Sequence, residues 1–127
     1  MASESLHEER SALKPLTLDM HRAIASLMEE LEAVDWYAQR VDAAEDAELR
    51  DILAHNRDEE KEHAAMILEW IRRRDPGFDE HLRTYLFTEG SVTELEEDAE
   101  GDGAAAGGAA APSGSGDLGI GSMRETR

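Results

Sequence analysis

Apolar side chains recur along residues 16–44 at alternating spacings of four and three. Residues spaced in this way share one face of an α-helix. The stretch contains no glycine or proline, and Pro15 is suited to the first turn of a helix. The pattern therefore predicts a long amphipathic helix from about Leu16 to Ala44, with these apolar positions on one face: Met20, Ile24, Leu27, Leu31, Val34, Ala38 and Val41.

A second long helical pattern covers residues 46–74 and ends at the sequence Asp-Pro-Gly, residues 75–77. Proline disfavours helical backbone at the residue before it, so the helix should stop there. A third, shorter helix is predicted from Phe78 to about Thr88, and residues 91–97 can add a further turn or two. No useful strand-like alternation occurs, and the second helix has these apolar positions on one face: Leu49, Ile52, Leu53, Ile67 and Trp70.

The two long helices are each about 42 Å long at the usual rise per residue. The short connection at residues 42–46 predicts that they lie antiparallel. A hairpin of this kind buries only one side of each helix, so a partner is needed to cover the rest. The predicted fold is all-α: an antiparallel two-helix hairpin plus a short C-terminal helix, which dimerises into a four-helix bundle.

The inward stripe of the second helix is interrupted by three polar residues, Asn56, Glu60 and His63. Burying an unpaired carboxylate is costly, so something must compensate for it. Glu60 and His63 form a Glu-x-x-His pair, the spacing with which di-iron and di-manganese bundles hold metal in their cores. The alternative is a solvated charged face with no ligand, because this pair of residues is common on helices, and Asp58 and Glu59 beside it read as such a face.

Glu30 lies at the edge of the apolar stripe near the middle of the first helix. A glutamate opposite a Glu-x-x-His pair is half of the four-helix di-metal site, which uses two of each. A two-fold dimer doubles the ligands and also covers the open side of each hairpin. We therefore expect the metal site to form at a subunit interface.

The chain has 127 residues and a formal net charge of −17. This charge repels phosphates, which argues against nucleic acid as a partner. The lack of cysteine excludes disulfides, thiol nucleophiles and zinc ribbons. No apolar run is long enough to span a membrane and the first ten residues do not resemble a signal peptide, so we expect a soluble cytoplasmic protein.

Composition divides the chain into four predicted segments. Residues 1–15 form a flexible arm, residues 16–97 the helical domain, and residues 98–116 a disordered Gly/Ala/Ser linker. Residues 117–127 follow as a docking peptide, because a short apolar tip on a flexible tether can bind a partner. A frayed terminus with chance apolar residues is the alternative reading of that tip, which contains Leu118, Ile120 and Met123.

Three segments of the domain resemble the encapsulated ferritin family: MEELEAVDWY at 28–37, HNRDEEKEHAAM at 55–66 and HLRTYLFTE at 81–89. The tail GDLGIGSMR at 116–124 is similar to the cargo-loading peptide that docks proteins inside encapsulin shells. That peptide often has leucine where Met123 stands here, a swap between apolar side chains that is usually tolerated. The pairing of this domain with this tail makes the resemblance specific.

The resemblance implies a ferritin-like ferroxidase that oxidises Fe(II) with dioxygen at a di-iron centre and feeds iron to an encapsulin nanocompartment. It also implies a ring of ten subunits built from dimers, located in the cytoplasm inside the shell. Glu30, Glu60 and His63 match the di-iron ligands, and Glu29 and Glu32 match acids that attract or stage incoming metal. Residues near the centre are matched by Trp36, Tyr37 and His55, although packing at Trp36 and a surface position for His55 are the simpler readings.

Other functions remain open at this point. A rubrerythrin-like peroxidase or a manganese protein uses overlapping ligands. A non-catalytic helical cargo or scaffold protein would need its acids only for solubility. A helical regulatory module would leave the polar interruption of the second helix unexplained.

Overall fold

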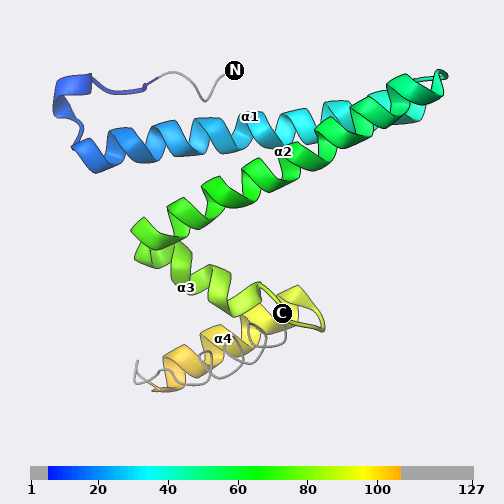
Figure 1. The fold of residues 1–127 in the computed structure, drawn as a ribbon. Helices are drawn as coiled ribbons and strands as arrows, with labels where there is room; N and C mark the ends of the chain where they lie inside the picture. Colours follow the sequence, from blue (N-terminus) through cyan, green and yellow to red (C-terminus); the bar gives the residue numbers. More distant parts are fainter. Residues whose placement is uncertain (1–5, 107–127) are drawn as a thin grey trace. The chain divides into compact units, whose positions relative to one another are not determined.

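The computed structural model describes residues 6–106, and the side chains of residues 6–101. A 3-10 turn, η2 (Arg10–Ala12), precedes helix α1 (Pro15–Ala43) and helix α2 (Ala47–Arg74). Helices α3 (Pro76–Tyr85) and α4 (Val92–Ala106) follow (Figure 1). The described residues contain no strand, so the predicted all-α class is confirmed.

Aspartate side chains cap the first turns of α2 and α3. Asp46 Oδ2 accepts a hydrogen bond from the backbone N–H of Leu49 at 2.8 Å and caps the start of α2. Asp75 Oδ1 accepts one from the N–H of Phe78 at 3.1 Å and caps α3, which has Pro76 in its first turn. Each aspartate satisfies a backbone donor that has no partner inside the helix.

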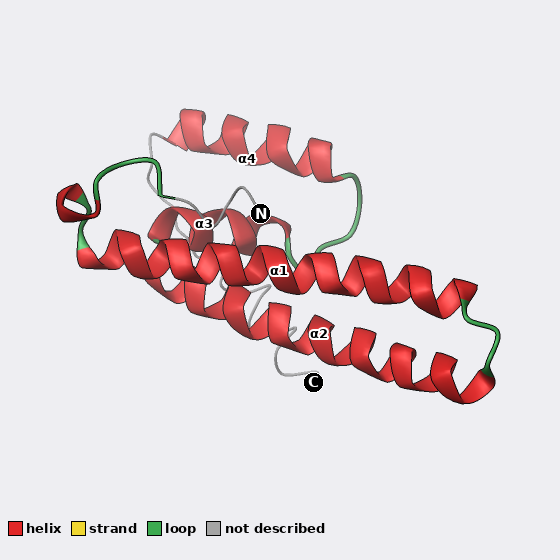
Figure 2. Ribbon diagram, turned by 90° about the horizontal axis from the view of Figure 1, so that it is seen from above, coloured by secondary structure: helices red, strands yellow, loops and turns green. Residues whose placement is uncertain are grey.

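The chain divides into two compact units between Arg74 and Asp75. In the first unit, α1 and α2 lie side by side and antiparallel, joined by residues 44–46 (Figure 2). The guanidinium of Arg50 donates two hydrogen bonds, at 2.7 and 3.1 Å, to the carbonyl of Ala44 and so ties the start of α2 to the connection. The predicted hairpin is therefore present.

The hairpin covers only part of each apolar stripe. On α1, Ile24 and Leu31, both predicted on the apolar face, are 41% and 55% exposed in the single chain. The stripe has two sides, and a single partner helix covers one of them, as expected for a hairpin that needs a further partner. The other members of the predicted stripe are half-buried: Met20, Leu27, Val34, Ala38 and Val41.

Helix α2 shows the same division. Leu49 and Ile52, also predicted on the apolar face, are about half exposed, whereas Leu53, Ile67 and Trp70 are half-buried. Among the described side chains, the only buried apolar ones are Ala64 and Ile71. One chain therefore leaves much of its apolar surface in contact with water.

In the second unit, α3 and α4 contact each other. Helix α3 ends at Tyr85, three residues earlier than expected, and Phe87 has a positive φ of 61°, which a helix cannot continue through. Gly90, with φ of 95°, completes the turn into α4.

Helix α4 continues to Ala106. The sequence predicted at most two turns after residue 91 and a disordered linker from residue 98. The structure differs, because the described part of that linker, residues 98–106, is helical. Alanines and acidic residues keep the helix going past the first glycine of the segment. Residues 107–116 of the predicted linker and the whole predicted docking peptide, residues 117–127, lie outside the described residues.

Within residues 6–106, no helix combines the length and the apolar character needed to cross a membrane.

The cap of α2 gives a direct test of the hairpin. Replacing Asp46 by alanine removes the acceptor for the Leu49 N–H and should lower the free energy of unfolding by about 1 kcal/mol. Asp46→Asn keeps a side-chain oxygen and should stay close to wild type. Urea unfolding followed by circular dichroism measures both, with Glu45→Ala as the neighbouring control. Equal stability of Asp46→Ala and Glu45→Ala would contradict the cap.

Candidate metal centre

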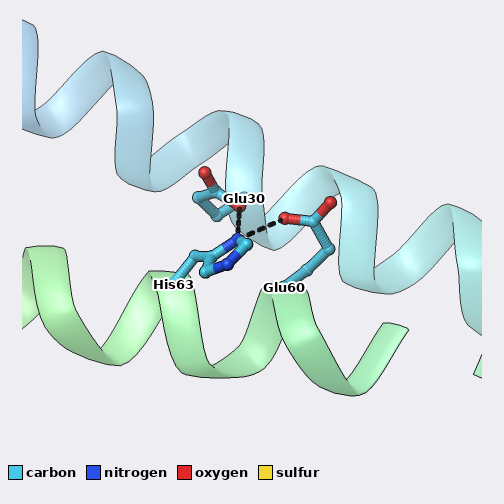
Figure 3. Close-up of side chains that lie close together, drawn as sticks. All are labelled: Glu30, Glu60 and His63. Carbon is cyan, nitrogen blue, oxygen red and sulfur yellow. Dashed lines mark hydrogen bonds and ion pairs between the residues drawn. The ribbon is translucent and has the colours of Figure 1, made fainter. Parts of the chain in front are cut away.

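Glu30, Glu60 and His63 come together between α1 and α2 (Figure 3). The ring nitrogen Nδ1 of His63 lies 3.3 Å from Oε1 of Glu60 and 3.6 Å from Oε1 of Glu30. One ligand atom from each residue falls within 4.8 Å of the others. Two carboxylates and one imidazole therefore converge on a volume that fits a divalent metal ion.

The two helices contribute to the cluster in different ways. Glu60 and His63 are three residues apart on α2, which places both side chains on the same face one turn apart. Glu30 reaches the cluster across the hairpin from the middle of α1. The cluster therefore depends on the register in which the two helices pack.

The cluster is only partly enclosed. The side chains of Glu30 and Glu60 are each about a quarter exposed, at 25% and 24%, and that of His63 is 44% exposed. Asn56, the third polar residue of the predicted interruption, is also half-buried. A site with this much open surface has room for ligands from another molecule.

Proximity changes the acidity of all three groups. A hydrogen bond shared with Glu60 raises the pKa of Glu30 above its ordinary 4.5, and burial adds to this. The same hydrogen bond lowers the pKa of Glu60, and His63 adds to that effect. Hydrogen bonding to Glu60 also raises the pKa of His63 above 6.5. A positive charge beside the two carboxylates is therefore favourable, and a bound cation would supply one.

Glu59 is a contact that sequence reasoning assigned only to a solvated charged face. Its Oε1 lies 3.8 Å from Nε2 of His63, the ring nitrogen that faces away from the other two carboxylates. Its Oε2 lies 3.9 Å from Nε2 of His55. The spacing of four residues between His55, Glu59 and His63 was the signal available in the sequence, because such residues are neighbours on a helix. His55 is therefore linked to the cluster only through Glu59.

The two other glutamates of α1 do not join the cluster. Glu29 is exposed and Glu32 is half-buried, and neither forms an ion pair with a described residue. Their assignment to incoming metal stays a prediction.

The rings of Trp36 and Tyr37 lie against an arginine side chain. The guanidinium of Arg40 lies 5.9 Å from the ring centre of Trp36 and 5.4 Å from that of Tyr37, within the range of cation–π attraction. No hydrogen bond joins Tyr37 to the cluster in the described part of the chain. Trp36 is 48% exposed, and both rings stay predicted neighbours of the centre.

Comparisons with known proteins agree on one family. The model of the family described as EncFtn-like matches residues 5–89. The chain is 60% identical over 126 residues to the encapsulated ferritin-like protein of Rhodospirillum rubrum, covering 97% of this chain and 90% of that one. It is 56% identical over 99 residues to the ferritin-like protein of Thermotoga maritima, covering 78% of this chain and 87% of that one.

Two further relatives extend the comparison. The encapsulin nanocompartment cargo protein EncC of Myxococcus xanthus is 38% identical over 81 residues, covering 60% of this chain and 62% of that one. The crystal structure of a Nitrosomonas europaea protein has a TM-score of 0.68 and 64% sequence identity. That match covers 69% of this chain and 97% of the other.

The acidity of His63 tests the geometry of the cluster without any metal. Glu60→Gln removes the negative charge nearest to Nδ1, so the pKa of His63 should fall towards 6.5. Glu62→Gln removes the same charge from the residue next to His63, but Glu62 is exposed and should leave that pKa close to wild type. An NMR titration of the histidine ring protons measures both variants. Equal effects of the two substitutions would contradict the cluster.

Proposed function

The chain belongs to the EncFtn-like family, and on that premise we propose that it is a ferroxidase that oxidises Fe(II) to Fe(III) with dioxygen. The observation that carries this proposal is the convergence of Glu30, Glu60 and His63 within 4.8 Å. Carboxylate oxygens and a neutral imidazole suit iron, and a carboxylate can bridge two ions. In this role Glu30, Glu60 and His63 would hold the iron, with Glu60 as the carboxylate shared between two ions, and the iron would supply one-electron transfer to dioxygen.

The di-iron site is proposed to form between two copies of the chain. One chain supplies two carboxylates and one imidazole, half of the set used by four-helix di-iron bundles. A two-fold axis beside the half-open cluster brings in the other half. The same association covers the exposed apolar residues of the hairpin, which include Ile24, Leu31 and Ile52. We further propose that such dimers assemble into the ring of ten subunits that the family resemblance implies.

Charge explains why this site takes up its substrate and then passes it on. Four carboxylates from two chains repel one another until two Fe(II) ions balance their four negative charges. Two Fe(II) ions give one electron each to dioxygen, which takes up two protons to form hydrogen peroxide; four Fe(II) ions and four protons are needed to form two molecules of water. The product Fe(III) carries more charge than the four carboxylates balance, which favours its movement out of the site.

The surrounding residues take supporting roles in this proposal. Glu29 and Glu32, on the same helix as Glu30, attract Fe(II) towards the site. Trp36 and Tyr37 border the completed centre, where their rings are held by Arg40. His55 supports the outer side of the site through Glu59.

The oxidised iron is proposed to be stored inside an encapsulin shell in the cytoplasm. Leu118, Ile120 and Met123 dock the chain to the inner surface of that shell. The sequence GDLGIGSMR at residues 116–124 supports this role, and so does the relative named as an encapsulin nanocompartment cargo protein. Neither nucleic acid nor a membrane is expected as a partner.

Aerobic oxidation of Fe(II), followed by near-ultraviolet absorbance, tests the activity. Glu60→Ala removes the bridging carboxylate and should reduce the rate to that of Fe(II) without protein; Glu30→Ala and His63→Ala should do the same. Glu62→Ala, an exposed acid on the same helix, should retain the wild-type rate. A wild-type rate no faster than the protein-free rate would contradict the ferroxidase and favour a non-catalytic scaffold protein. Consumption of added hydrogen peroxide without oxidation of Fe(II) by dioxygen would indicate a peroxidase.

Assembly should depend on the metal, because ligands that bind only the associated form stabilise it. Sedimentation velocity of the full chain, with and without anaerobic Fe(II), should show a shift from smaller to larger species when Fe(II) is added. Glu60→Ala should lose most of this shift. An unchanged distribution in wild type would contradict the coupling between metal binding and assembly.

A further inference from the structure

We propose that Glu59 is a positioning residue that orients His63 for metal binding by accepting the proton on its outer ring nitrogen. The proposal rests on the proposed function, in which Glu30, Glu60 and His63 bind metal. It adds a residue that lies on the other side of the imidazole from the metal.

The first support is the orientation of the His63 ring. Its Nδ1 faces Glu60 at 3.3 Å and Glu30 at 3.6 Å, and Figure 3 shows the second ring nitrogen turned away from both carboxylates. A neutral imidazole carries one proton. When Nδ1 gives its lone pair to a metal ion, that proton must reside on Nε2, and it needs an acceptor.

Glu59 is placed to be that acceptor. Its Oε1 lies 3.8 Å from Nε2 of His63, longer than a hydrogen bond. The two residues are four apart on α2, a spacing at which side chains are neighbours, so rotation of the side chains alone closes the gap. Contacts of this kind commonly shorten when the ligand binds. Metal-binding histidines usually donate their second N–H to a carboxylate or carbonyl, which fixes the ring and makes it a better ligand.

His55 lies near the other oxygen of the Glu59 carboxylate. Oε2 of Glu59 lies 3.9 Å from Nε2 of His55, so the two oxygens face different rings. His55, Glu59 and His63 thus form a row along one face of α2. The row is largely exposed, with 49% of the Glu59 side chain and 70% of the His55 side chain accessible, so its contacts add little to stability. We therefore assign this row to orienting His63 and not to stabilising the fold.

Glu62 provides a matched control. It is also a glutamate, it adjoins His63 in the sequence, and it is exposed. Its side chain forms no hydrogen bond or ion pair with another residue of the described chain. The same substitution at Glu59 and Glu62 therefore changes charge and helix propensity equally, but only the first removes an acceptor from His63.

The test is anaerobic titration of the full chain with Co(II), a probe that binds without oxidation and reports its ligands by visible absorbance. Glu59→Leu should weaken Co(II) binding about tenfold. Glu62→Leu should stay within about twofold of wild type, and Glu59→Gln, which keeps an oxygen acceptor, should recover most of the loss. Circular dichroism checks that all variants retain their helices. Equal affinities of Glu59→Leu and Glu62→Leu would overturn the proposal.

A second measurement observes the proton itself. In protein labelled with 15N-histidine and loaded with diamagnetic Zn(II), the Nε2–H of His63 should give a slowly exchanging resonance in wild type and Glu62→Leu, but not in Glu59→Leu. A Glu60→Ala arm separates the two proposals. If Glu60→Ala binds Co(II) as wild type does, the metal site is wrong and the role of Glu59 falls with it. If Glu60→Ala loses binding while Glu59→Leu keeps both affinity and resonance, only the role of Glu59 is wrong.

Discussion

Two packed helices cannot bury all of each other's apolar side chains, and both the exposed surface of the hairpin and the position of its polar cluster depend on this constraint. In the α1–α2 hairpin each helix covers one side of its neighbour, which leaves Ile24 and Leu31 outside while Leu27 and Val34 are half-buried. The apolar stripe is wider than one partner helix can cover. Burial of such surface is the main favourable term in forming interfaces, and this is the physical basis of the proposed association between chains.

The cluster of Glu30, Glu60 and His63 lies on the boundary between the covered and uncovered sides, and its position follows from the same constraint. Deep burial would force these groups to be neutral, and full exposure would leave them hydrated and apart. At about a quarter exposure, the hydrogen bond between the two carboxyls raises the pKa of Glu30, and hydrogen bonding to Glu60 raises the pKa of His63. A cation bound there, as proposed, would relieve the repulsion between the two carboxylates.

Sequence patterns predicted the hairpin, its two long helices and the three clustered residues, because each follows from spacing along one helix and from one short connection. The exposure of Ile24 and Leu31 could not be read in the same way, since periodicity identifies a face but not the number of helices that cover it. The length of helix α4 was underestimated because the glycine content suggested a linker, whereas alanine and glutamate in this segment favour helix as far as Ala106. Glu59 was missed because it adjoins Glu60 and was read as part of a charged face.

The position of Glu59 shows how one helix can serve two sides of one ring. His63 belongs to two rows on α2: it is three residues after Glu60, which faces Nδ1, and four after Glu59, which faces Nε2. Glu59 and Glu60 belong to the same helix as the imidazole, so their spacing from it along the backbone does not depend on how α1 packs. Glu30 alone among these contacts comes from the other helix, so a change in hairpin register would remove it and leave the pair on α2 intact. The Glu60–His63 pair is therefore set by α2 alone, whereas the contact of His63 with Glu30 depends on the packing of α1.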